Sequence, residues 1–570
     1  MRNRRIMKRI LPVIPDKIFP FRKLCPEGGF ARIVYAGLLF LSASYLLLVM
    51  TLYNALNRTC SFPILLALPL WIAGLAVTLK AADFLRMKFS YPVEAIAADP
   101  PVMRTIDRVL IVCFFLFAAV FLLDQPDFNN PDTVDQWNQV QTLQFRDWHP
   151  VLHTLLIRAT SRITDTMTES ALVQFFLLLL TFRWLLHLLY RNGVPEKWIR
   201  IILWYWVLNP VTWWLYQTIL KDAVLVILAL LLTGQLALLF FSEGERLKKW
   251  STLLILFLLL SGIFLIRHNG GMIVLPLLVL LPFIYRKYAL RLIGIAVLVL
   301  GSVYLVKNVA TIYLEHPGLR SSPFSEEFRS AKKETLKERR NQTCFETVGL
   351  PMSIMGGVLL LDPERLPEKA KAFLLGIEPE AVWRRYLLFG NYNTFKWKND
   401  HSVALKKEIL RMEPKEFLSL FFQTVRSAPQ TSLRAAARQT EVVWAPTAEF
   451  DYELPGFPQE SFTRFDRRFL INLLNSPIFA WLWSVGSCNV LFLFLAVGLI
   501  RRHGEKVLTL TLPWLCYNWG TMLLLCAQDY RFFAFNPMLL LPVAAVLLRR
   551  KEENCRKEPE NGTEVSAPKP

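Results

Sequence analysis

The sequence lacks the residue spacings that mark metal sites and disulfide frameworks. Its eight cysteines are scattered along the chain, with no CxxC pair and no cysteine–histidine ligand spacing. It also contains no glycine-rich phosphate loop and no internal repeat. A zinc knuckle, a disulfide-stapled fold and a nucleotide-binding P-loop are therefore not indicated.

Acidic residues are in the minority: 65 lysines and arginines face 45 aspartates and glutamates, which gives a formal net charge of +20. A basic excess can indicate nucleic acid as a partner. Here, however, the basic residues lie in short connections between hydrophobic runs, such as 86–104, 191–200 and 501–506. This is the positive-inside pattern of a membrane protein, and no nucleic-acid-binding module surrounds it. We expect the lipid bilayer as a partner and no nucleic acid.

Long hydrophobic runs dominate the chain, in which 54% of the residues are hydrophobic. Each run approaches the roughly 20 residues that a helix needs to cross about 30 Å of hydrocarbon. The sequence therefore predicts an all-α polytopic membrane protein with about 12 transmembrane helices. The expected spans are 33–53, 63–79, 109–123, 171–190, 201–217, 223–241, 250–266, 272–284, 292–305, 478–500, 507–526 and 533–548.

The distribution of charge orients these spans and divides the chain into segments. Both termini are expected in the cytoplasm, and the long stretch of mixed charge before the last three helices is expected outside. The run Gly349–Leu361 within that stretch is too short to span and is expected to pack on the membrane domain or at the interface. The expected segments are a basic cytoplasmic arm, 1–32; two additional transmembrane helices with a cytoplasmic loop, 33–108; a transmembrane module, 109–306, with an external loop, 124–170; a mostly helical external (periplasmic) domain, 307–475; C-terminal transmembrane helices, 476–549; and a disordered cytoplasmic tail, 550–570.

Polar motifs gather at helix ends on the side expected to face outward. The first part of the external loop, 124–158, carries five aspartates together with tryptophans and histidines: Asp124, Asp127, Asp132, Asp135, Asp147, Trp137, Trp148, His149 and His153. Three further helix ends on the same side are also charged: Lys221-Asp222, Arg267-His268-Asn269-Gly270 and Gln528-Asp529-Tyr530-Arg531.

Each motif taken alone also has a purely structural interpretation. Arg267 or Arg531 can anchor a helix at the lipid headgroups, and Lys221-Asp222 can be a local helix cap. Together, their chemistry is complementary. A carboxylate can deprotonate an attacking hydroxyl or hold a divalent cation, whereas one lysine and two arginines can neutralise a departing phosphate. This combination at a bilayer surface favours group transfer from a lipid-linked phosphate.

The run NPDTVDQWNQVQTLQFRDWHPVLHTLL, residues 130–156, resembles the first external loop of the GT-C class of integral-membrane glycosyltransferases. In that class an Asp follows the first helix of the catalytic module, and an HP element comes later in the loop. The motifs at 221–222, 267–270 and 529–531, and Gly349-Leu350-Pro351 in the long external segment, are similar to further features of the class. The resemblance covers roughly 109–548 and makes 109–306 the catalytic module.

The resemblance implies a donor sugar on a polyprenyl phosphate, and a glycan, lipid or protein acceptor at the outer face of a bacterial cytoplasmic membrane. It implies Asp132 as the catalytic base, with Asp135 left open. The chain lacks the adjacent Asp-Glu pair of several GT-C families, so a metal (Mg or Mn) also stays open. The residues expected to bind substrate are Trp148, His149, Lys221, Asp222, Arg267, Asn269 and Arg531.

Other functions fit the same pattern in part. An envelope polysaccharide polymerase or ligase would use the same kind of donor but transfer an oligosaccharide. A transporter or flippase for a lipid-linked glycan normally places ionisable residues or broken helices at mid-depth, and here the charges gather at the outer helix ends. A scaffold would use the external domain and keep the helix-end motifs as anchors.

Overall fold

The computed structural model describes residues 25–26, 29–57, 66–93, 101–124, 131–216, 219–387, 392–397, 401–446, 476, 479–526 and 528–550. Over these residues the protein is helical and forms no strand, although Tyr91 and Arg549 make an isolated backbone bridge. Three of the expected features lie outside the described residues: most of the basic arm, the disordered tail at 551–570, and Asp127.

Seven helical stretches among the described residues are long and apolar enough to cross a membrane, as a helical membrane protein requires. They are Gly29–Leu56, Ala67–Phe89, Met167–Arg191, Lys221–Phe241, Arg286–Glu315, Val485–Leu523 and Tyr530–Leu548. Shorter apolar helices accompany them, among them Trp250–Ile266 and His268–Ile284. The larger number of 12 spans stays a prediction.

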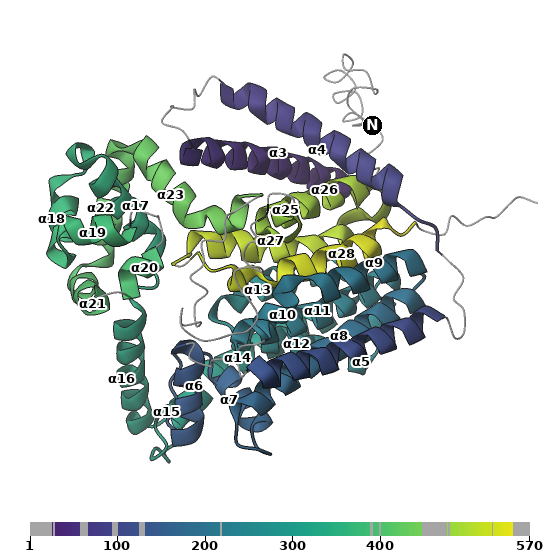
Figure 1. Ribbon diagram of the computed structural model, residues 1–570, viewed down its shortest axis with the longest axis horizontal. Coiled ribbons are helices and arrows are strands. Elements are labelled where there is room, and N and C mark those ends of the chain that lie inside the picture. Colours follow the sequence, from purple (N-terminus) through teal and green to yellow (C-terminus); the bar gives the residue numbers. More distant parts are fainter. Residues whose placement is uncertain are drawn as a thin grey trace, which may run out of the picture.

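The helical bundle is the larger part of the structure (Figure 1). Its first helices are α3 (Gly29–Asn57), α4 (Ala67–Phe89), α5 (Pro101–Asp124), α6 (Pro131–Thr142), α7 (Val151–Thr160), α8 (Met167–Arg191), α9 (Glu196–Leu208), α10 (Pro210–Leu215) and α11 (Lys221–Phe241). There follow η2 (Glu245–Lys248), α12 (Trp250–Ile266), η3 (His268–Gly270), α13 (Gly271–Ile284), η4 (Arg286–Tyr288), α14 (Ala289–Leu305), the π-helical turn η5 (Val306–Ala310) and α15 (Thr311–Glu315). The last are α25 (Ala480–Trp483), α26 (Val485–His503), η7 (Gly504–Lys506), α27 (Val507–Leu523), η8 (Tyr530–Phe533) and α28 (Phe535–Leu548).

Most of the expected span boundaries differ from the structure by several residues, and two of the differences change the course of a helix. The run 201–217 was expected to form one span, but the helix ends at Leu208 and a short helix restarts at Pro210. Proline cannot donate the backbone hydrogen bond that would continue the helix, and the Asn209 side chain accepts from the backbone N–H of Val211 at 3.0 Å instead. The helix that begins with α14 continues through η5 and α15 to Glu315, beyond the expected domain boundary at 306.

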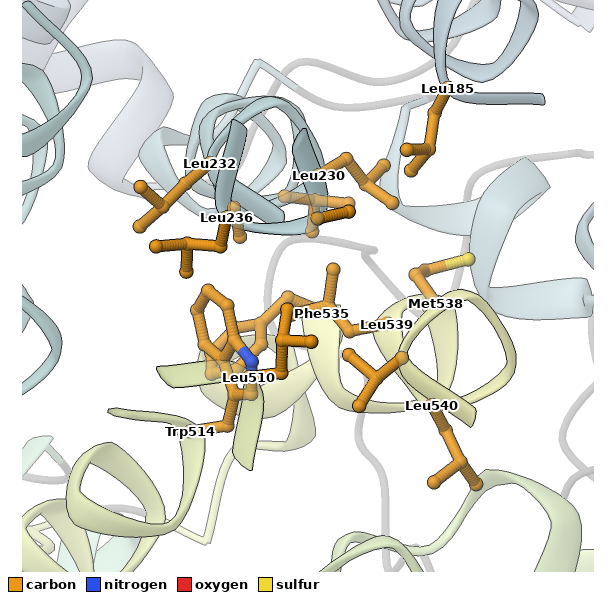
Figure 2. Close-up of a cluster of buried hydrophobic side chains, with 14 of the residues drawn as sticks. Leu185, Leu230, Leu232, Leu236, Leu510, Trp514, Phe535, Met538, Leu539 and Leu540 are labelled. Carbon is orange, nitrogen blue, oxygen red and sulfur yellow. The ribbon is translucent and has the colours of Figure 1, made fainter. Parts of the chain in front are cut away.

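The core of the bundle forms where α11 packs against α28 and α27. Figure 2 shows Leu230 and Leu236 of α11 opposite Trp514 and Phe535, and all four side chains are buried. Helices in lipid associate through such close van der Waals packing, because lipid tails are as apolar as leucine. Since α11 begins at Lys221, and η8 leads directly into α28, this packing fixes the positions of charged residues at both helix starts.

Buried amides join the last three helices. The Asn518 side chain donates to Oδ1 of Asn489 at 2.7 Å and to Oδ1 of Asn536 at 2.8 Å, which connects α27 to α26 and α28. Asn489 also donates to the hydroxyl of Tyr45 in α3 at 3.1 Å. Hydrogen bonds between membrane helices contribute about 0.6 to 2 kcal/mol each, so this network supports the arrangement that the apolar packing sets.

Residues 326–444 form a separate helical unit, the inserted domain, at the end of the bundle where α6 and α7 also lie (Figure 1). Its helices are α16 (Glu326–Thr343), α17 (Gly349–Leu361), η6 (Pro363–Arg365), α18 (Glu368–Ile377), α19 (Glu380–Leu387), α20 (Tyr392–Trp397), α21 (His401–Arg411), α22 (Pro414–Ser427) and α23 (Pro429–Trp444). Ser325 caps α16 by accepting from the backbone N–H of Phe328 at 3.1 Å.

The α17 helix agrees only in part with its expected place. It begins against the membrane bundle, since a Cβ atom at Gly349 would lie 2.5 Å from Cα of Cys526. The rest of the helix forms the centre of the inserted domain, in contact with α18, α19, α20, α22 and α23. Its residues Met352, Met355 and Leu359 have no exposed surface. An apolar helix of this length is too short to cross a bilayer, and here its hydrophobic residues are buried by the surrounding amphipathic helices.

The two N-terminal helices pack on the C-terminal part of the bundle, α4 against α26. A Cβ atom at Gly498 would lie 2.7 Å from the backbone oxygen of Ala82, so the close approach requires glycine. We predict that Gly498→Ala lowers the free energy of unfolding by about 1–3 kcal/mol, because the two backbones must separate. Gly294→Ala is the matched control, since a Cβ atom there meets nothing within 4 Å. Thermal unfolding in detergent measures both, and equal melting temperatures for the two variants would contradict the predicted contact.

Candidate active site

The two candidate carboxylates lie on one face of α6. Pro131 is the first residue of this helix, a position that suits proline, and Asp132 in the first turn interacts favourably with the helix dipole. Asp135 follows one turn later. Nε2 of His149 lies 4.0 Å from Oδ1 of Asp132 and 3.6 Å from Oδ2 of Asp135, so both carboxylates face this histidine. The sequence-based expectation that a helical loop would bring the two together agrees with this geometry.

The α6 helix is held in place by buried polar side chains. The Thr133 hydroxyl donates to the backbone oxygen of Ile219, just before α11, at 3.0 Å. Gln136 donates to the Thr154 hydroxyl of α7 at 3.0 Å, and its side-chain oxygen lies 2.9 Å from Nδ1 of His153. These contacts hold the face that bears Asp132 against the starts of α7 and α11.

Two cations from distant parts of the chain bind the same oxygen of Asp132. Nζ of Lys221 lies 3.1 Å from Oδ2, and Nη2 of Arg531 lies 3.3 Å from it. Lys221 is the first residue of α11, and Arg531 lies in η8, before α28. Lys221 also contacts Nδ1 of His149 at 3.1 Å. Because an ammonium group can only donate, Nδ1 accepts, and the ring proton is on Nε2, which faces the carboxylates.

More deeply buried charged residues, Asp222, Arg267 and Asp529, adjoin the contact of Lys221 and Arg531 with Asp132 and form a second layer of charge. The Asp222 side chain is fully buried, forms an ion pair with Arg267, and has its Oδ2 3.9 Å from Nε of Arg531. Asp529 pairs with Nε of Arg531 at 2.5 Å, and its other oxygen accepts from the backbone N–H of Arg531 at 3.1 Å. Buried charges are stable only when they are paired, so this layer compensates both arginines and fixes their directions.

Arg267 and Asn269 are placed by a sharp turn between α12 and α13. A Cβ atom at Gly270 would lie 2.0 Å from the backbone oxygen of Ile263, so this turn requires glycine. Nε of Arg267 donates to Asn269 at 2.7 Å, and Asn269 donates to the hydroxyl of Tyr517 at 3.1 Å. The guanidinium group also lies 4.3 Å from the ring centre of Phe532. Arg267 therefore joins the cluster through its ion pair with Asp222, whereas Lys221 and Arg531 contact Asp132 directly.

Trp148 connects the site to the inserted domain. Its ring stacks on Phe345 with 5.9 Å between ring centres, and its backbone oxygen lies 3.3 Å from Nε2 of His268. The preceding Asp147 pairs with Arg339 of α16 at 3.3 Å. The segment that carries His149 is thus held between the bundle and the inserted domain.

The charges fix the protonation of the site. Burial alone raises the pKa of Asp132, but the neighbouring charges of Lys221 and Arg531 outweigh burial and hold that pKa below its usual range. Burial and the charge of Lys221 hold the pKa of His149 well below its usual value. At neutral pH, Asp132 is therefore an ionised carboxylate and His149 a neutral imidazole.

The structure brings most of the expected residues into one network of contacts. Asp132, Asp135, His149, Lys221, Asp222 and Arg531 are linked directly, Arg267 joins them through Asp222, and Asn269 joins them through Arg267. The ring of Trp148 packs on the inserted domain instead. Sequence reasoning placed Asp529 in a charged motif but not among the substrate-binding residues, and it left out Phe532, although both are neighbours of Arg531 in sequence. It had no signal for Arg339 or Phe345, which come from the inserted domain.

A divalent cation was left open by the sequence. Among the described residues, no group of three or more His, Cys, Asp or Glu side chains is arranged to hold a metal ion. The pair Asp132 and Asp135 with His149 does not form such a group, because Oδ2 of Asp132 is already occupied by two cations. The described residues therefore form no ready site for Mg or Mn, and the cation stays an open prediction.

Comparisons with known proteins do not place the chain in a family. No protein-family model matches it, and no curated protein or solved structure matches it significantly. The GT-C resemblance therefore rests on the sequence motifs. The geometry adds a separate observation, namely that helix ends far apart in the sequence converge on one carboxylate.

The depressed pKa of His149 predicts how stability depends on pH. Since the unfolded chain protonates this histidine near pH 6.5 and the folded chain only at lower pH, stability is lost as the pH falls below about 6.5. We predict that His149→Gln reduces this loss by up to about 1.4 kcal/mol per pH unit. Denaturant unfolding in detergent at a series of pH values measures the slope. Identical slopes for the variant and the wild type would show that His149 is not held neutral.

Proposed function

We propose that the protein is a membrane glycosyltransferase that moves a sugar from a polyprenyl-phosphate carrier to an envelope acceptor. The acceptor is a glycan, lipid or protein at the outer face of a bacterial cytoplasmic membrane. One observation carries the proposal: a lysine and an arginine from separate helix ends meet at Oδ2 of Asp132. A base beside phosphate-binding cations is the pair of groups that glycosyl transfer from a phosphate requires.

The proposed reaction is a single displacement that inverts the anomeric carbon. The acceptor hydroxyl oxygen forms a bond to the anomeric carbon while the bond from that carbon to the phosphate oxygen breaks. The bonding electrons leave with the polyprenyl phosphate, and the hydroxyl proton passes to the carboxylate of Asp132. Lys221 and Arg531 neutralise the charge that develops on the leaving phosphate. Arg267, which is paired with the buried Asp222, adds to the positive charge around the phosphate.

Asp132 is a better candidate for the base than Asp135. Its side chain is 24% exposed and in contact with both cations, so a phosphate held by Lys221 and Arg531 would lie next to it. The Asp135 side chain is 46% exposed and contacts His149 and Gln139. A base acts within hydrogen-bond reach of the proton it accepts, which favours the carboxylate nearer to the phosphate site.

The position of the inserted domain supports a role for this domain in selecting the acceptor. It lies at the same end of the bundle as α6 (Figure 1), and its Phe345 packs on Trp148, next to His149. Aromatic faces suit the apolar faces of sugar rings, and an acceptor that enters between this domain and α6 would reach Asp132. With the positive-inside orientation, this end of the bundle faces outward.

The catalytic role of Asp132 predicts a large loss of activity on substitution. We predict that Asp132→Asn lowers the rate of sugar transfer by about 10²–10⁴-fold, because the amide cannot accept the proton. Asp165→Asn is the matched control. It removes the same charge from the same loop at an exposed position, and the left-handed backbone there tolerates asparagine. Proteoliposomes supplied with a panel of polyprenyl-phosphate sugars and an envelope extract report release of polyprenyl phosphate and mass of the product.

The same assay separates the alternatives. Transfer of a single sugar supports the proposal, whereas addition of an oligosaccharide identifies an envelope polysaccharide polymerase or ligase. Movement of the intact donor across the bilayer, without release of polyprenyl phosphate, identifies a transporter or flippase. Full transfer by both Asp132→Asn and Asp135→Asn contradicts the assignment of a carboxylate base on α6.

A further inference from the structure

The charges of the site balance without a substrate. Among the described residues, three cations are in contact with three carboxylates within the cluster. The cations are Lys221, Arg267 and Arg531, and the carboxylates are Asp132, Asp222 and Asp529. These six described residues therefore carry no surplus positive charge with which to bind an anion. A phosphate that enters must take cations away from one of the carboxylates, because an added buried charge without a partner costs several kcal/mol.

The exposed fraction of each side chain determines which carboxylate an entering phosphate can displace from its cations. The side chain of Asp222 is 0% exposed and that of Asp529 is 6% exposed, so an entering ligand cannot reach their contacts. The Asp132 side chain is 24% exposed, and its Oδ2 is the meeting point of Lys221 and Arg531. This oxygen occupies the position that an oxygen of a bound phosphate would take.

The two oxygens of Asp132 have different neighbours. Oδ2 is held by the two cations, and Oδ1 faces His149, whose Nε2 lies 4.0 Å away. When the cations turn to a phosphate, the carboxylate keeps a neutral neighbour that can donate to it. Asp132 is then no longer neutralised by positive charge, which is the condition under which a carboxylate accepts a proton readily.

We propose that the donor phosphate displaces Asp132 from Lys221 and Arg531, so that this carboxylate is released to act as the base only after the donor has bound. This inference rests on the proposed function and adds an order of events to it. Before the donor binds, Asp132 competes with the phosphate for the same two cations. After it binds, the freed carboxylate lies beside the phosphate, where the acceptor hydroxyl must be activated.

Competition between a carboxylate and a phosphate has an unusual consequence for binding. Removing the negative charge of Asp132 removes the competitor, so Asp132→Asn binds polyprenyl phosphate about tenfold more tightly than the wild type does. A residue that simply contributed to the donor site would show the opposite effect. The same variant loses sugar transfer, so the phosphate binds more tightly while catalysis falls.

The experiment measures binding of polyprenyl phosphate to the full chain in phosphatidylcholine nanodiscs by isothermal titration calorimetry. Asp165→Asn is the matched control, because it removes the same charge from the same loop at an exposed position outside the cluster. It changes the affinity by less than about twofold, since its exposed charge is screened by salt. Phosphatidic acid, a phosphate monoester without a prenyl chain, tests in a separate titration whether the phosphate group alone is sufficient.

Equal or weaker binding by Asp132→Asn overturns the inference while leaving the proposed function in place. Equal tightening by Asp132→Asn and Asp165→Asn also overturns it, because a general change of charge would then explain the effect. Absence of binding to all three proteins overturns the proposed function, and the inference with it. Asp132→Ser provides a second test with the same expected direction, should the asparagine variant not fold.

Discussion

Mutual compensation of buried charges is the constraint on which the rest of the site depends. Asp222 and Arg267 are almost fully buried at the ends of apolar helices, where an unpaired charge would cost several kcal/mol. Each charged group therefore needs a partner of opposite sign, and apart from the pair Asp529 and Arg531 these partners come from different helix ends. Lys221 starts α11, Arg267 follows α12, and Arg531 precedes α28. The pairing of charges thus requires these helix ends to meet, and the site exists only in the fully assembled bundle.

Apolar packing brings those helix ends close enough to pair. The α11 helix packs along α28 through side chains such as Leu236 and Phe535, and the turn at Gly270 lets α13 return beside α12. Neither feature is polar, yet both determine where the charged side chains lie. The apolar core therefore determines the geometry of the site. Close helix packing fixes the backbone positions, and the ion pairs then select the side-chain directions.

The sequence allowed the helices to be predicted much better than their contacts. The expected run 250–266 coincides with α12, because an uninterrupted apolar run has only one favourable state in lipid. Topology also predicted that the motifs share one side. It did not predict that Lys221 contacts Asp132 while the adjacent Asp222 contacts Arg267. Successive residues of a helix point about 100° apart, so the partner of each depends on tertiary packing.

The contacts of Asp132 create a conflict between stability and function. A carboxylate held by two cations stabilises the assembled site, but the same cations make it a weak base. In the proposed order of events, sharing the cations with a phosphate resolves the conflict, because the stabilising pairs remain until a ligand of the same charge replaces the carboxylate. Asp222 and Asp529 retain Arg267 and Arg531 during this exchange, since their own contacts are buried beneath it. The second layer of carboxylates is thus what allows the first to be released without loss of the site's geometry.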